Sequence, residues 1–296
     1  AAWVLDDIRP LRAIADNGIV SKKLALFEPP TAYQAAIQQP TGSRFGADAL
    51  YQGENRNGGA IISYYVDVPK VDKKENLADK KGSKKQDEKD NVDAKKAKNN
   101  VKFDSIQLEI FDGTRQIRTL KFKAPKESGV HKTTWYLREK GVDRASRSIR
   151  KSTREPGGVS VKPGTYRLKM TFGDAVSEQD IKVEFDPRLK ISDDAINQKY
   201  DASKELEKYQ ETMANIVKQL VESKNTATAI KSDLSKADAS SGSAEKKYKD
   251  QIKSSTEIIK NIDSLLAMYL GKIDKRQGIT RNPEITVSQR FSQASR

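Results

Sequence analysis

Two pairs of adjacent acidic residues are the first candidates for chemistry: Asp6-Asp7 near the start of the chain, and Asp193-Asp194. Carboxylates that work together as acid and base must converge on one bond across a defined gap. Adjacent residues of a strand point to opposite faces, so Asp6 and Asp7 predict a turn at a strand end. Asp193 and Asp194 stand where a helical pattern begins, and acidic residues there complement the helix dipole. Neither pair predicts a catalytic site.

His131 is the one histidine of the chain, and there is no cysteine. One histidine excludes a multi-histidine metal site, and the lack of cysteine excludes disulfides and thiolate sites. His131 stands in a strand-like segment with no visible nucleophile beside it, which favours a strand residue over a catalyst. The sequence also lacks a phosphate-binding glycine loop, a GxSxG motif and metal-ligand spacing. We therefore expect no catalytic, cofactor-binding or metal-binding residue in this chain.

Aromatic side chains are the remaining candidates for direct contacts. Trp135 and Tyr136 could stack on sugar rings, but neighbouring strand residues face opposite ways, so at least one should lie in a core. Phe27 and Tyr33 stand in an irregular segment that we expect to pack along a neighbouring surface. With Trp3, these residues are the predicted interaction or docking positions.

Composition limits the class of partner. The net charge is +14, but Lys and Arg are interleaved with Asp and Glu, as in KKENLADKKGSKKQDEKD. A nucleic-acid site would gather cations on one face with aromatic residues between them, so the sequence disfavours nucleic acid as a partner. Acidic glycans, lipid headgroups or an acidic protein fit such a surface equally well. No apolar run reaches the roughly 18 to 20 residues that span a bilayer.

The first part of the chain predicts a strand and a connector. Trp3 to Leu5 form a strand-like run within residues 1–12, and Pro10 disfavours a helix after it. Residues 13–57 carry Pro, Gly and scattered aromatic residues, which predict an extended connector. A strand so close to the start has no evident partner, and we expect it to belong to a domain upstream.

Residues 58–190 predict an antiparallel β-sandwich. Apolar residues alternate in about six short segments separated by Gly and Pro turns. Tyr166, Leu168, Met170 and Phe172 show the period of two after the turn at Pro163-Gly164. Residues 69–100 carry few apolar side chains and predict a disordered or loop insertion. The fold class expected is therefore β plus α in several domains, with a fibronectin type III or immunoglobulin-like sandwich.

From Ser192 the apolar period changes to three and four. Two such runs, separated by the turn ASSGS, predict a long antiparallel α-helical hairpin over residues 191–277. Two helices bury little by themselves, so a third helix or the sandwich should cover them. Residues 278–296 predict the start of a further helix.

Several stretches together resemble the C-terminal region of secreted bacterial Asp-box repeat proteins. These are sortilin-like β-propellers often labelled glycosyl hydrolases. WVLDDIRPLR resembles their last propeller strand, and GGAIISYYV their first strand after the propeller. GVHKTTWYLR and KPGTYRLKMTFGD with IKVEFDPRL resemble their fibronectin type III-like module. Insertions at 69–100 and 141–160 depart from the family. The Asp-box sequence and the arginine and tyrosine positions of sialidases are absent, so the hydrolase activity does not transfer.

The resemblance implies an exported protein that is periplasmic, outer-membrane-associated or extracellular. We expect a non-catalytic structural and interaction region with two partners, the upstream propeller of the same protein and another exported or outer-membrane protein. An accessory module of a glycan-active propeller enzyme, with a glycan as ligand, is the alternative. A basic region that binds membranes or nucleic acid through residues 69–100 is a third hypothesis.

Overall fold

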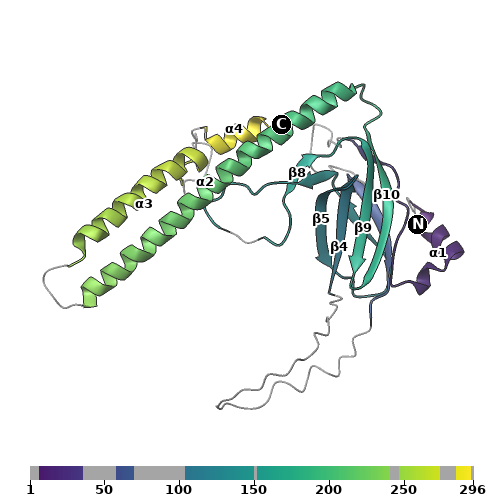
Figure 1. Ribbon diagram of the computed structural model, residues 1–296, viewed down its shortest axis with the longest axis horizontal. Coiled ribbons are helices and arrows are strands. Elements are labelled where there is room, and N and C mark those ends of the chain that lie inside the picture. The colour runs from purple at the N-terminus through teal and green to yellow at the C-terminus, as the bar shows by residue number, and fades with distance from the viewer. Residues whose placement is uncertain are drawn as a thin grey trace, which may run out of the picture. The chain divides into compact units, whose positions relative to one another are not determined.

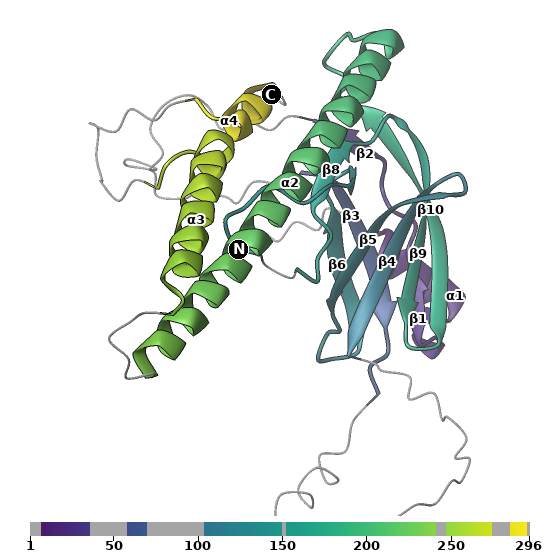
Figure 2. The same cartoon turned by 60° about the vertical axis from the view of Figure 1, so that its left-hand side comes forward.

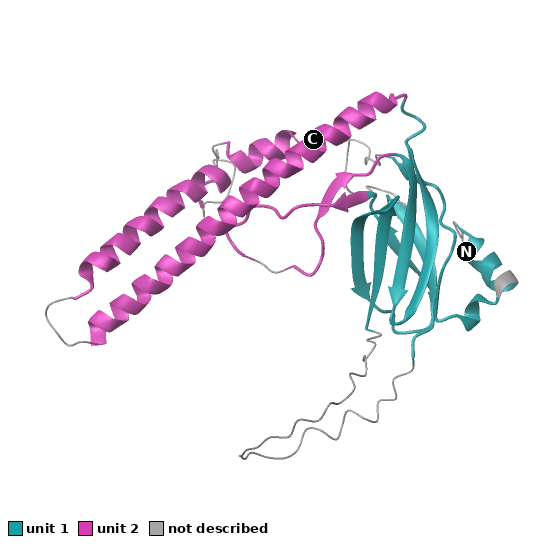
Figure 3. Cartoon of the chain, viewed as in Figure 1, with its two compact units in different colours: residues 1–137, 163–189 teal, residues 138–162, 190–296 magenta. Residues whose placement is uncertain are grey.

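The computed structural model describes residues 7–35, 58–69, 104–149, 152–240, 247–273 and 285–294. It combines antiparallel sheets with a long helix, α2 (Asp193–Ser240), which confirms the expected mixture of β and α structure. The chain divides into two compact units (Figure 3). Unit 1 comprises residues 1–137 and 163–189, and unit 2 comprises residues 138–162 and 190–296. The predicted sandwich range 58–190 therefore contains a segment, 138–162, that groups with the helices.

Unit 1 contains two sheets, drawn in Figures 1 and 2. The first has the strand order β1-β3-β6 and the second the order β2-β10-β9-β4-β5. Neighbouring strands are antiparallel except β2, which runs parallel to β10. The bounds are β1 Leu24–Leu26, β2 Ala32–Gln34, β3 Ala60–Val66, β4 Ser105–Asp112, β5 Arg115–Lys123, β6 Gly129–Trp135, β9 Gly164–Phe172 and β10 Ala175–Phe185.

The core of unit 1 follows the period of two in its strands. In β9 the buried residues are Tyr166, Leu168, Met170 and Phe172, as the sequence predicts. Aromatic contacts join the two sheets. The ring centroids of Trp135 in β6 and Tyr166 in β9 are 5.5 Å apart, and those of Tyr64 in β3 and Phe122 in β5 are 6.0 Å apart. The apolar faces of the two sheets thus cover each other.

A helix lies near the start of the described residues, which corrects one expectation. Helix α1 (Arg9–Asn17) has Pro10 in its first turn, where the missing N–H costs no hydrogen bond, so Pro10 does not prevent a helix. A short 3₁₀ helix, η1 (Ile19–Ser21), follows. The strand predicted at Trp3 to Leu5 and the insertion at 70–100 lie outside the described residues.

The predicted connector is not merely extended. Within residues 13–35 it contains most of α1, η1, and the strands β1 and β2, one in each sheet. Strands of three residues carry almost no alternation signal, and each is fixed by pairing with a distant strand. Leu26 is opposite Tyr64, and Ala32 is opposite Val183. These residues are therefore part of the β unit.

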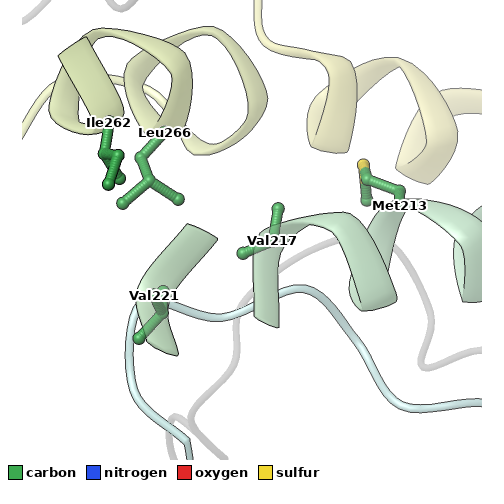
Figure 4. Packing of buried hydrophobic residues seen from close by; sticks show 5 residues of the cluster. All are labelled: Met213, Val217, Val221, Ile262 and Leu266. Atoms are coloured by element: carbon green, nitrogen blue, oxygen red, sulfur yellow. The ribbon is translucent and has the colours of Figure 1, made fainter. Parts of the chain in front are cut away.

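Unit 2 is built on helices, with one small strand pair. Its elements are β7 (Arg138–Lys140), β8 (Gly157–Ser160), α2, α3 (Lys249–Leu270) and α4 (Val287–Ala294). Helices α2 and α3 lie side by side in Figures 1 and 2. Figure 4 shows their shared buried cluster, against which Val287 and Phe291 of α4 also pack. The cluster consists of Met213, Val217, Val221, Ile262 and Leu266.

All three chain connections between the units leave unit 1 at the same end of its sheets. Val183, near the end of β10, is opposite Gly164 at the start of β9. Trp135, which ends β6, contacts Tyr166 near the same start.

Candidate interaction site

The structure describes four of the five predicted docking residues and does not gather them. Phe27 is 2% exposed and packs with Ile19, Ala25 and Tyr65, where α1 and η1 contribute to the cluster on one face of the first sheet. Trp135 is 1% exposed, between the sheets. Both side chains therefore serve the core of unit 1. Trp3 lies outside the described residues.

The other two predicted residues are exposed. Tyr33, on the edge strand β2, is 46% exposed, and Tyr136 is 68% exposed. The contrast between Tyr136 and its neighbour Trp135 confirms that one of the two is a core residue. Tyr33 and Tyr136 remain accessible for contacts.

The polar residues singled out in the sequence have structural partners. His131 Nε2 lies 3.0 Å from the carbonyl oxygen of Glu127, and its ring stands 5.9 Å from that of Tyr64. Asp7 accepts hydrogen bonds from the backbone N–H and the Nε of Arg9, at 3.1 and 2.8 Å, at the start of α1. This agrees with a turn at Asp7, although here the turn precedes a helix. Asp6 lies outside the described residues.

Asp186 forms an ion pair with Arg188 just after β10. Arg188 donates its backbone N–H and its Nε to Asp186 Oδ1 at 3.0 and 2.9 Å, and its Nη2 to Oδ2 at 2.5 Å. These hydrogen bonds lower the pKa of Asp186 to about 2. The ion pair closes the turn after β10, so the Asp186 carboxylate has a structural role.

Unit 2 contains a buried polar network that the sequence reasoning missed. The side chain of Glu139 in β7 is 5% exposed. It accepts hydrogen bonds from the Tyr200 hydroxyl at 2.6 Å and from Lys204 Nζ at 3.3 Å. Lys204 also donates to Glu207 at 2.5 Å. Burial lowers the pKa of Lys204, but the hydrogen bonds and charges of Glu207 and Glu139 outweigh this and raise it overall.

Two glycines let β7 and β8 approach each other and α2 closely. A Cβ atom on Gly158 would lie 2.7 Å from the Cα of Gly141 and 2.6 Å from Glu207 Oε1. A Cβ on Gly141 would lie 2.7 Å from the backbone of Gly157. Side chains of any size are excluded there. The sequence shows that both residues are glycines, but only the packing shows that a larger side chain would not fit at these positions.

The segment between β7 and β8 also holds the helices. Arg147 donates from Nη2 to the carbonyl oxygens of Leu266, at 3.4 Å, and Gly271, at the C-terminal end of α3. A cation there complements the helix dipole and the unpaired carbonyls. Ala145 packs against the helical cluster. Together with α4, this segment contacts the helices.

Exposed, uncharged positions recur every seven residues along α2, in a repeat that we call the α2 seam. It consists of the exposed positions Tyr209, Ile216, Ser223, Ile230 and Ala237. All five are uncharged, although 32% of the chain is charged. The sequence assigned the apolar residues of this helix to one stripe, but the structure divides them. Met213, Val217 and Val221 are buried, whereas Tyr209, Ile216 and Ile230 are 55%, 37% and 48% exposed.

Three exposed apolar side chains on or beside α1 and η1 of unit 1 form a second group, which we call the α1–η1 patch. It consists of Ile8, Leu11 and Val20, which are 44%, 55% and 58% exposed. The inward residues Ala13, Ile14 and Ile19 of the same segment pack toward Phe27 and Tyr65. The segment is therefore amphipathic, with its outer side chains open to contact.

A groove of about 720 Å³ runs along α3, lined by residues that include Ile259, Lys260, Asp263 and Ala267. Asp263 is paired with Lys224 of α2 at 2.6 Å, so this carboxylate is engaged and the groove offers mainly apolar contact. Within the described ranges, no cluster of three or more potential metal ligands occurs. Among the helices in those ranges, none has the length and hydropathy to cross a membrane.

Among the described residues, exposed apolar side chains occur in the α1–η1 patch of unit 1 and in the α2 seam of unit 2. Searches against known protein families, curated proteins and solved structures find no match for this chain.

Proposed function

We propose that this chain is a structural and interaction region of an exported β-propeller protein, composed of a fibronectin type III-like sandwich and an antiparallel helical hairpin. Its role is to make protein–protein contacts, with its own upstream propeller and with another exported or outer-membrane protein. The chain itself carries no catalytic step. The observation that carries the proposal is the grouping of exposed apolar side chains into the α1–η1 patch and the α2 seam.

The strand order of unit 1 supports the sandwich assignment. Immunoglobulin-like sandwiches place strands A, B and E in one sheet and C, F and G in the other. The same separation results when β1, β3 and β6 are taken as A, B and E, and β4, β9 and β10 as C, F and G. β5 then adds a strand beside C. Tyr166 near the start of β9 occupies the place of the tyrosine corner in such sandwiches.

The packing of unit 2 supports the hairpin assignment. Helix α2 ends at Ser240 and α3 begins at Lys249, and a short connection favours antiparallel neighbours. Lys224 of α2 and Asp263 of α3 form an ion pair at 2.6 Å beside the shared apolar cluster.

The α1–η1 patch is the surface we assign to the upstream propeller. It belongs to the first described segment, and its inner side is fixed on the sheet by Ile14 and Ile19. A rigid support with apolar side chains outward suits a permanent contact between domains.

The test is binding in trans between this chain and the separately produced upstream region of the same protein. We expect the wild-type chain to bind, and the association constant of the Leu11→Asp variant to be about tenfold or more lower, as measured by isothermal titration calorimetry. Leu189→Asp is the matched control, since Leu189 is 51% exposed and follows β10, away from the patch. Absence of binding by the wild-type chain overturns the proposed function. Equal binding by both variants overturns the choice of patch.

The exposed ring of Tyr136 favours one second candidate, the accessory module of a glycan-active propeller enzyme. Sugar faces stack on exposed aromatic rings, so this role predicts retention of the chain on insoluble polysaccharide that Tyr136→Ala abolishes. Retention that Tyr136→Ala leaves unchanged contradicts it.

A further inference from the structure

The α2 seam repeats every seven residues over much of the longest helix. Tyr209, Ile216, Ser223, Ile230 and Ala237 are all exposed and all uncharged. On a straight helix a seven-residue repeat drifts by about 20° per heptad, and it stays on one side where two helices wind around each other, so such repeats are typical of a helix packed along another helix. The seam is offset from the row of Met213, Val217 and Val221, which is buried in the cluster with α3.

The length of the seam restricts what can cover it. At about 1.5 Å per residue, the distance from Tyr209 to Ala237 is about 42 Å. Helices α3 and α4 have 22 and 8 residues and already pack on the buried row. Of the helices in the described ranges, α2 itself, with 48 residues, is the one long enough to match the whole seam.

The order of side chains along the seam is self-complementary when two copies run antiparallel about Ser223. Ile216 of one copy then lies opposite Ile230 of the other, and Tyr209 opposite Ala237, so that a large ring faces a small side chain. Ser223 faces its own counterpart, where its small size allows close approach. Such matching of large and small residues is what helix packing requires.

The available area suits a weak contact. A strip about 40 Å long and about 10 to 12 Å wide, the diameter of one helix, covers roughly 400 to 480 Å² per copy, which is at the low end of specific interfaces. Ile258 and Leu265 of α3, which are 50% and 43% exposed, are further exposed apolar side chains of unit 2.

We infer that the α2 seam is the interface of an antiparallel homodimer, in which two α2 helices pack about a two-fold axis at Ser223. This inference rests on the proposed role as an interaction region, and it names a second copy of the chain as one partner. The α2–α3 pair of each copy then becomes half of a four-helix assembly, with α4 packed beside each pair.

Engineered cysteines test the register, because the chain has no cysteine of its own. Under mild oxidation, Ser223→Cys should form a disulfide between copies, since a disulfide needs Cα atoms closer than about 7 Å. Asn225→Cys is the control, exposed on a different side of the same helix. Mixed Ile216→Cys and Ile230→Cys chains should cross-link with each other, whereas neither should cross-link alone. In a parallel dimer, Ile216→Cys chains and Ile230→Cys chains would each cross-link alone and not with each other, which would overturn the antiparallel register.

Sedimentation equilibrium tests the dimer itself. We expect the wild-type chain to be dimeric at about 100 µM, and Ile216→Glu with Ile230→Glu to raise the dissociation constant at least about tenfold with unchanged helix content. Asn225→Glu should leave the dissociation constant unchanged. A monomeric wild type, or a dimer that the double variant does not weaken, overturns the inference. A monomer that still binds the upstream propeller region leaves the proposed function intact.

Discussion

The cores of the two units differ in completeness. Among the largest fully buried side chains, Val217 is the one that belongs to unit 2. The others are in unit 1: Trp135, Phe172, Ile62, Ile106, Leu108, Ile110, Leu168, Met170, Ile181, Val66 and Val183. Two sheets bury each other's apolar faces, whereas two helices bury one row each and leave their other sides open.

Because unit 2 has fewer fully buried apolar side chains, other contacts must also stabilise it. Its apolar cluster is small, so it also relies on the network around Glu139 and on Arg147 at the end of α3. Polar contacts of this kind are directional and tolerate little change. We therefore expect the two units to unfold separately, with unit 2 the more sensitive to substitutions of polar residues and glycines.

The largest expected effect is in the core of unit 1. Trp135→Ala should lower the free energy of unfolding of unit 1 by about 3 to 5 kcal/mol, because it leaves a cavity beside Tyr166. Chemical denaturation followed by circular dichroism measures this. Tyr136→Ala is the neighbouring control and should change little. Equal effects of the two variants would contradict the burial of Trp135 and the exposure of Tyr136.

The next effect is in unit 2 and concerns a buried charge. Glu139→Ala should destabilise unit 2 by about 2 to 4 kcal/mol, because Lys204 and Tyr200 lose their buried acceptor. Hydrogen exchange of α2 reports on this unit separately from the sheets. Glu211→Ala, at an exposed position of the same helix, is the control. A loss of protection in the strands of unit 1 instead would show that the units are not separate.

Gly158→Ala tests the close approach of β8 to β7 and α2. The added methyl group collides with backbone atoms that cannot rotate away, which predicts a cost of about 1 to 3 kcal/mol in unit 2. Gly58→Ala is the control, because its Cβ would meet open space in unit 1. Thermal unfolding of both variants measures the difference, and a neutral Gly158→Ala would mean that the strand pair is loosely docked.

The smallest effect is the acid response of unit 1 at Asp186. Its folded-state pKa is about 2, whereas an unperturbed Asp has a pKa of about 3.9. The folded state therefore binds fewer protons between these values, and the stabilisation is present above pH of about 4 and lost as the pH falls through about 2. An NMR titration of the Asp186 carboxyl carbon should show the low pKa. Arg188→Ala should bring it back toward the ordinary value, and an unchanged pKa would exclude Arg188 as the cause.

Much of each unit could be predicted from local patterns. The alternation from Tyr166 to Phe172 identified a strand and its buried face correctly, because every second side chain of a strand points the same way. The period of three and four after Ser192 likewise predicted helices, and α2, α3 and α4 lie in the predicted ranges. A long helix or strand sums the weak conformational preferences of many residues, so its type can be predicted from the sequence.

The candidate surfaces could be predicted only in part. Tyr136 was a candidate and is exposed, whereas Phe27 and Trp135 were candidates and are buried. The seam residues Tyr209, Ile216 and Ile230 were recognised as apolar, but periodicity could not tell which row faces α3. Helix positions one residue apart differ by about 100° in direction, so two apolar rows can overlap in one sequence pattern.

The sequence by itself determined the types of the long elements, the lack of cysteine chemistry and the inward residues of the strands, since these depend on neighbours in the chain. Tertiary structure alone decided that β1 and β2 join different sheets and that residues 138–162 belong to the helices. It also decided that Glu139 is buried and that Gly158 must be small. These outcomes depend on contacts between residues far apart in sequence, such as Glu139 with Tyr200, and no local pattern encodes such a contact.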